Sequence, residues 1–190
     1  HGLCSLAWAA NMFTAASGDW NTPGNWSEGI VPTNGESVVI AGNVSLTNST
    51  AALAALTVNT GTTLTFDGWD TVLNATDVDI YGTVTHAANT ATTTNSLGQW
   101  VPNARVNIVC SNLSVNALGK IDGVGKGYAR GTSSSATAKI NGAGPGGGLS
   151  GYNENYLGGG GSHGGMGGRT GSRAVASGGV YGNPLAPMDP

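Results

Sequence analysis

Apolar and polar residues alternate along much of this chain, and one short phrase of that pattern occurs three times. The phrase occupies residues 56–66, 78–85 and 113–123, and each copy consists of an alternating run, a glycine and a second alternating run. Period-two alternation predicts β-strands, and a glycine between two runs supplies the positive φ that a tight corner needs. Each copy therefore predicts a strand, a corner and a second strand. The corner glycines are Gly61, Gly82 and Gly119.

The spacing of the three copies predicts a coiled arrangement of strands. The first two copies start 22 residues apart, which fits one turn of a β-solenoid, and the third starts 35 residues later, which requires an inserted loop or a missed turn. Residues 87–104 lack apolar periodicity and predict that inserted loop, whereas residues 105–110 restore the alternation. We expect an all-β fold, a short right-handed parallel β-helix (solenoid) over residues 17–123, with an extended N-terminal strand and a glycine-rich C-terminal arm.

The N-terminal segment, residues 1–16, has two interpretations. Its apolar stretch ends in Ala7-Trp8-Ala9, which fits the small-x-small rule for signal-peptide cleavage before Ala10. Alternatively, its alternation predicts an apolar strand that completes the sheet of a neighbouring copy. Either interpretation predicts export by a signal peptide to the cell surface or the extracellular space, and the segment is too short to span a membrane. The expected assembly residues, which include two further tryptophans, are Leu3, Leu6, Trp8, Met12, Trp20 and Trp26.

A family resemblance begins after the N-terminal segment. Between residues 18 and 40 the chain reads Asp-Trp-Asn, Asn-Trp, Val-Pro and then a turn into Val-Val-Ile. This order resembles the opening of β-solenoid passenger regions in bacterial autotransporters and related large surface adhesins. The resemblance implies that Trp20 and Trp26 cap an end of the solenoid, which would otherwise expose apolar side chains and sheet edges. Stacking on sugar rings is the alternative role for these tryptophans.

Glycine dominates the last part of the chain, residues 124–190. Gly-Lys-Gly-Tyr at 125–128, Gly-Pro-Gly-Gly-Gly at 144–148 and Val-Tyr-Gly-Asn-Pro at 180–184 resemble glycine-rich insertions of the same secreted β-solenoid proteins. Plain disorder is the compositional alternative, although interspersed tyrosines give the segment apolar anchors. We expect the end at residue 190 to be either a cut in a longer protein or a short terminal arm.

The composition argues against several classes of function. Only 9% of the 190 residues are charged and the formal net charge is −3, so clustered Lys and Arg for nucleic-acid binding are missing. With 10 acidic and 7 basic residues, no convergent acid–base set can be nominated, and we expect no enzyme and no cofactor. The aspartates at 67, 70, 77 and 79 lack the spacing of a calcium loop, so no metal site is predicted.

Two pairs of residues are candidates for other contacts. Trp69 and Trp100 are possible glycan contacts, because exposed aromatic rings stack on sugars, although the ring of Trp100 can instead fold back to cover the solenoid. Cys4 and Cys110 can pair as a disulfide in an exported protein, or Cys110 is a small buried hydrophobe. We expect an extracellular structural protein that assembles with copies of itself into a filament or surface layer. The alternative is a monomeric adhesin or a carbohydrate-binding fragment that contacts surface glycans.

Overall fold

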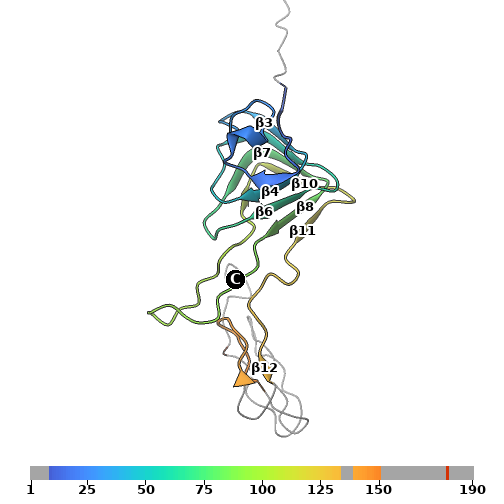
Figure 1. Ribbon diagram of the computed structural model, residues 1–190. Helices are drawn as coiled ribbons and strands as arrows, with labels where there is room; N and C mark the ends of the chain where they lie inside the picture. Colours follow the sequence, from blue (N-terminus) through green and yellow to red (C-terminus); the bar gives the residue numbers. More distant parts are fainter. Residues whose placement is uncertain (1–8, 134–138, 151–178, 180–190) are drawn as a thin grey trace, which may run out of the picture. The chain divides into compact units, whose positions relative to one another are not determined.

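The computed structural model describes residues 9–133, 139–150 and 179 (Figure 1). The chain divides into two compact units, one made of residues up to 88 together with 104–125, and the other made of 89–103 together with the residues from 126 onward. Over the described residues the structure is nearly all β, with one 3₁₀ turn, Pro23–Asn25, and no α-helix.

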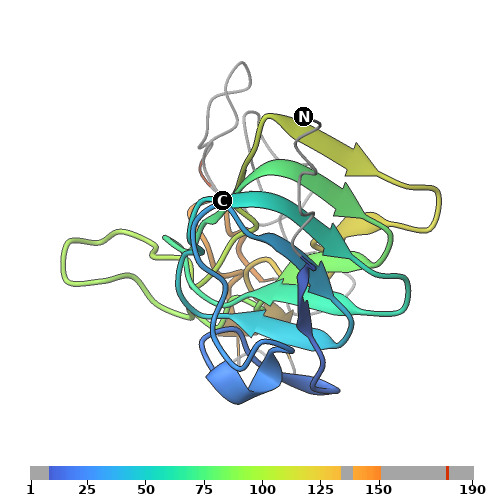
Figure 2. The same ribbon diagram turned by 90° about the horizontal axis from the view of Figure 1, so that it is seen from above.

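The first unit contains two parallel sheets, and the chain alternates between them (Figure 2). Sheet A has the order β1 (Asn11–Phe13), β3 (Ser37–Ile40), β5 (Leu53–Val58), β7 (Leu73–Ile80) and β10 (Asn112–Val115), and the short β9 (Ile108–Val109) also pairs with β7. Sheet B has the order β2 (Ser17–Asp19), β4 (Asn43–Leu46), β6 (Thr63–Phe66), β8 (Thr83–His86) and β11 (Lys120–Asp122). We call the two sheets together the stack.

The strand register confirms the alignment of the three repeated phrases. In sheet A, Leu56 pairs with Val78, and Val78 pairs with Leu113. In sheet B, the second halves of the same phrases pair in the same way through Leu64, Val84 and Ile121. The 35-residue step is therefore an inserted loop and not a missed turn, because residues 89–103 contribute no strand to the stack.

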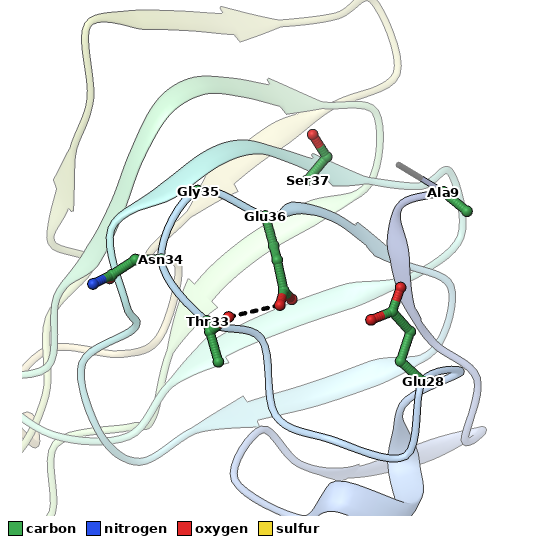
Figure 3. A pocket seen from close by; sticks show the side chains of 7 residues that line it. All are labelled: Ala9, Glu28, Thr33, Asn34, Gly35, Glu36 and Ser37. Carbon is green, nitrogen blue, oxygen red and sulfur yellow. Dashed lines mark hydrogen bonds between the residues drawn. The ribbon is translucent and has the colours of Figure 1, made fainter. Parts of the chain in front are cut away.

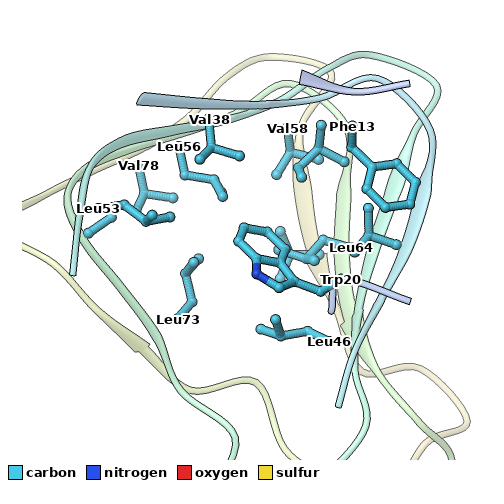
Figure 4. Packing of buried hydrophobic residues seen from close by; sticks show 14 of the residues in the cluster. Phe13, Trp20, Val38, Leu46, Leu53, Leu56, Val58, Leu64, Leu73 and Val78 are labelled. Carbon is cyan, nitrogen blue, oxygen red and sulfur yellow. The ribbon is translucent and has the colours of Figure 1, made fainter. Parts of the chain in front are cut away.

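The alternation places apolar side chains between the two sheets. Leu56, Leu64, Leu46 and Val78 are almost fully buried and belong to one core cluster (Figure 4). Residues in between, such as Thr65, point away from the core and are partly exposed. Because each strand carries one apolar and one polar face, the sequence pattern alone produces a two-layer core.

The three corner glycines serve two different purposes. Gly61 has φ of 80°, as predicted for a tight corner. The prediction is wrong for Gly82 and Gly119, whose φ angles are not positive. A Cβ atom at Gly82 would overlap the carbonyl oxygen of Asn59, and one at Gly119 would overlap that of Ile80. Glycine is needed at these two corners because consecutive turns of the chain pack backbone against backbone.

Some strands differ from the expectation. The alternation at 105–110 forms only the two-residue β9, and β2 was not predicted because Gly18 and Asp19 carry no apolar signal. In the second unit, β12 (Thr132–Ser133) pairs antiparallel with β13 (Lys139–Ile140) inside the glycine-rich region. The glycine-rich region therefore contains ordered pairing over its described residues, although nothing in its composition predicts a strand.

Candidate functional site

Aromatic side chains close the end of the stack formed by β1 and β2, which we call the first end. Trp20 and Trp26 are 1% and 3% exposed, and the indole Nε1–H of Trp26 donates a 2.7 Å hydrogen bond to the carbonyl oxygen of Trp20. Trp26 also packs edge-to-face against Phe13 and Trp20, at centroid distances of 5.2 and 4.7 Å. This burial supports the cap, and it leaves neither indole available for a contact with another copy or for stacking on a sugar.

Backbone atoms cover the outer edge of β1 at the same end. Phe13 and Trp26 form an antiparallel bridge, which is flanked by hydrogen bonds from Thr14 N–H to Asn25 O and from Ser27 N–H to Met12 O, both 2.8 Å. The side chain of Asn25 also donates to Asp19 O of β2 at 2.9 Å. The first edge of sheet A is therefore covered by residues 25–27 of the same chain, so a strand of a second copy cannot pair with β1 directly. In sheet B, the side chain of Asn25 occupies one outward carbonyl group of β2.

At the opposite end of the stack, no further strand of the described residues follows β10 and β11. Leu113, Val115 and Ile121 occupy the core register of these last strands, yet they are 48%, 48% and 46% exposed. Their partners on the preceding strands are almost fully buried. These partners are Val78, Ile80 and Val84. The core therefore ends in an apolar surface, which we call the open end.

The backbone edges at the open end lack partners within the described residues. β10 and β11 are the last strands of their sheets. The N–H groups of Asn116 and Lys120 donate back to Ile80 O and Gly82 O of the preceding turn, each at 2.9 Å. Because neighbouring residues of a strand direct their backbone groups to opposite sides, Ile121 in β11 presents its N–H and C=O to the open edge. Such an edge is a template for pairing with another strand.

One ion pair lies at the edge of β11. The ammonium group of Lys120 is 2.8 Å from Asp122 Oδ2, and Asp122 Oδ1 accepts a 2.9 Å hydrogen bond from the N–H of Val124. Lys120 and Asp122 flank Ile121 and point to the outer face of sheet B. At the open end, the apolar side chain of Ile121, which faces the core, thus lies in sequence between one positive and one negative side chain on the outer face.

The two candidate glycan-binding tryptophans each contact a neighbouring side chain of the same chain. The guanidinium carbon of Arg105 lies 4.4 Å from the ring centroid of Trp69, and Arg105 Nε donates to Trp69 O at 2.9 Å. In the second unit, Trp100 packs edge-to-face on Tyr128 at 5.3 Å. Both tryptophans remain partly exposed. One face of Trp69 is thus occupied by Arg105, where a stacked sugar would otherwise lie.

A pocket of about 550 Å³ opens near the start of β3 and contains two carboxylates (Figure 3). Glu36 accepts a 2.6 Å hydrogen bond from the Thr33 hydroxyl through Oε1, while its buried Oε2 has no hydrogen-bond partner among the described residues. Glu28 lines the opposite side, and Ala9 lies at the rim. Sequence reasoning did not identify this pair, because the two glutamates belong to turns without a motif. Their charge would favour a cationic group over an anion.

Several predicted site residues lie outside the described residues, namely Leu3, Cys4, Leu6 and Trp8. Met12 lies in β1, 38% exposed on the outer face of sheet A. Cys110 is partly buried against the core and has no disulfide partner within the described part of the chain. The Cys4–Cys110 disulfide therefore stays a prediction. Sequence reasoning missed the role of Leu113, Val115 and Ile121, although their place in the last repeated phrase was an available signal.

No long apolar helix capable of crossing a membrane occurs over the described ranges, and no group of three His, Cys, Asp or Glu side chains there could hold a metal ion. No family model, curated protein or solved structure matches the chain.

Proposed function

We propose that the stack is a short right-handed parallel β-helix (solenoid), and that the protein is an extracellular structural subunit that assembles with copies of itself. The alternation of the chain between two sheets supports the helix, because each new strand pairs in parallel with the preceding strand of the same sheet. Connections between parallel strands of one sheet are right-handed in nearly all proteins, which supports the hand.

The difference between the two ends of the stack is the observation on which this proposal depends. The first end is closed by Trp26 and by the backbone of residues 25–27, whereas the open end exposes Leu113, Val115 and Ile121 at two edges that have no partner strand among the described residues. Exposed apolar positions next to free strand edges favour association by strand pairing. Burying three half-exposed apolar side chains stabilises such a contact by about 1 kcal/mol each.

The N-terminal segment supplies a second proposed contact, by strand addition. The described chain enters β1 with Asn11 and Phe13 facing the core and Met12 facing outward. Residues 11–13 already pair with β3 of their own chain, so a donated strand would come from residues before Asn11. Because the edge of β1 is covered, this strand would add to the open end of a neighbouring copy, as the alternative to direct pairing of the last strands, and would link subunits into a filament or a surface layer.

Negative-stain electron microscopy of the full chain beside two variants tests the proposal. One variant lacks residues 1–8, and the other carries Leu113→Lys at the open end. We expect regular assemblies of the unaltered protein and smaller particles for both variants. Thr65→Lys is the matched control, because it adds the same charge to the outer face of β6, away from either end. Monomers of the unaltered protein at all concentrations would contradict the proposal.

A monomeric adhesin or carbohydrate-binding fragment is the second candidate function. The partial exposure of Trp69 and Trp100 supports it, whereas their contacts with Arg105 and Tyr128 oppose it. Binding of the monomer to a glycan array, lost on Trp100→Ala, would favour this candidate over the structural subunit.

A further inference from the structure

We propose that the open end is self-complementary, so that two copies join through it about a two-fold axis. This inference rests on the proposed function, because it specifies the geometry of the contact that we propose at the open end. The occupant of the open end is then β10 and β11 of a second copy, and the stacks of two subunits form one continuous core.

The closed first end argues against direct head-to-tail stacking. A second copy that approached with its first end would present residues 25–27 and the covered edge of β1, so its sheet A would offer no strand edge to β10. The open end of a second copy presents the edges of β10 and β11, which have no partner strand among the described residues, and the same three apolar side chains. An isologous contact therefore matches edge with edge and core with core, whereas a head-to-tail contact matches neither.

The backbone of β11 has the correct phase for this symmetry. Lys120 N–H donates to Gly82 O on the inner side, so Ile121 directs its N–H and C=O to the open edge. In an antiparallel pair, two such residues exchange both hydrogen bonds when they lie directly opposite each other. A two-fold axis at Ile121 places this residue opposite its own symmetry mate, with both side chains in the core register.

The charges of β11 match in the same arrangement. Antiparallel pairing centred on Ile121 places Lys120 opposite Asp122 of the partner subunit, and Asp122 opposite Lys120 of the partner subunit. Each copy thus contributes one cation and one anion to the contact. The two intersubunit charge pairs lie beside the 2.8 Å ion pair that each chain already forms internally. Opposite charges across an antiparallel pair are stabilising, while a parallel pairing in register would place like charges together.

The same axis fits β10. Asn116 N–H donates to Ile80 O, so Leu113 and Val115 direct their backbone groups outward to the open edge, and Ser114 does not. Pairing centred on Ser114 places Leu113 opposite Val115 of the partner subunit. Ser114 precedes the turn from Asn116 to Gly119 by two residues, and Ile121 follows that turn by two, so one axis can cross both strands.

Cysteine cross-linking of the full chain tests the symmetry directly. In a background with Cys4→Ser and Cys110→Ser, Ser114→Cys places two thiols at the axis, with Cα atoms about 4.5 Å apart. That separation is within the range that a disulfide spans. Asn112→Cys is the matched control, because it lies on the same face of β10 but is about 14 Å from its symmetry mate. We expect at least a tenfold higher yield of disulfide-linked dimer for Ser114→Cys.

Charge exchange provides a second, independent readout. We expect Lys120→Asp to weaken dimerisation roughly tenfold. The substitution places two carboxylates opposite each other at each of the two sites where Lys120 would face Asp122 of the partner subunit. Adding Asp122→Lys to this variant should restore the dimer, since the exchange preserves both the internal and the intersubunit pairing of charge. Denaturation of both variants, measured in parallel, separates this effect from a loss of folding stability.

The outcomes separate this inference from the proposed function. Large assemblies without a Ser114→Cys cross-link would overturn the two-fold contact, and would point to residues 1–8 of another copy or to a later segment of the chain as the occupant. Equal cross-linking of Ser114→Cys and Asn112→Cys would overturn it as well. Specific cross-linked dimers that never form larger particles would support the two-fold contact and contradict the filament or surface layer.

Discussion

Replacing Gly82 by alanine is expected to unfold the stack at a much lower denaturant concentration. A Cβ atom at this corner would overlap Asn59 O and would lie 2.5 Å from Thr62 O and 3.2 Å from Val58 Cγ1. Ordinary contacts between carbon and a carbonyl oxygen are about 3.3–3.6 Å long, so the corner has to move by about 1 Å. Both oxygens belong to the backbone of the preceding turn and cannot rotate away.

The magnitude follows from two terms. Overpacking of a well-packed site costs about 1–3 kcal/mol. The movement also weakens the hydrogen bonds from Gly82 N–H to Val58 O at 3.0 Å and from Thr83 N–H to Thr62 O at 2.9 Å, which are worth about 1 kcal/mol each. We therefore expect the free energy of unfolding to fall by about 3 kcal/mol, which lowers the urea midpoint by about 1.5 M.

Urea denaturation followed by circular dichroism measures this change. Gly24→Ala is the matched control, because its Cβ atom would meet no atom within 4 Å and its φ is not positive, so its stability should change by less than about 0.5 kcal/mol. Equal midpoints for Gly82→Ala and Gly24→Ala would refute the close packing of consecutive turns.

Three further predictions concern side-chain contacts. Trp26→Phe should lower the free energy of unfolding by about 1–3 kcal/mol in urea denaturation, because it leaves Trp20 O without the Nε1–H donor in a buried site; an unchanged midpoint would contradict the cap. Burial raises the pKa of the Tyr128 hydroxyl, and the Asn89 side chain lowers it by less. The stability from the neutral phenol is therefore present below the unfolded pKa of about 10 and is lost as pH rises through the folded pKa. Ultraviolet titration of the unaltered chain against Tyr128→Phe measures the raised pKa, and urea denaturation of both proteins over the same pH range measures the loss of stability. Arg105→Met should change the tryptophan fluorescence by uncovering one face of Trp69, and an unaltered spectrum would contradict the stacking.

The repeated phrases were sufficient to predict most of the stack. Alternation located β3 to β8, β10 and β11, and the copies at Leu56, Val78 and Leu113 predicted which strands are neighbours. Alternation works here because each strand has one face in the core and one face outside it. The pattern could not reveal β2, whose register depends on pairing with β4 and not on apolar side chains.

The candidate site was harder to predict for a different reason. The sequence pattern of Leu113, Val115 and Ile121 is the same as that of Leu56, Val58 and Leu64, which are buried. Whether a residue in core register is covered depends on the presence of a following strand, and that is a property of the tertiary structure. Trp20 and Trp26 were expected both to cap the solenoid and to take part in assembly, and the structure places them inside the first end.

Sedimentation velocity over a range of protein concentrations is the most direct test of the claim that copies meet at the open end. The comparison is between the unaltered chain, Ile121→Lys at the open end and Thr65→Lys on the outer face of sheet B. We expect concentration-dependent association of the unaltered chain and of Thr65→Lys, and monomers for Ile121→Lys. Equal association of all three proteins would contradict a contact at the open end, because the contact would then lie elsewhere on the molecule.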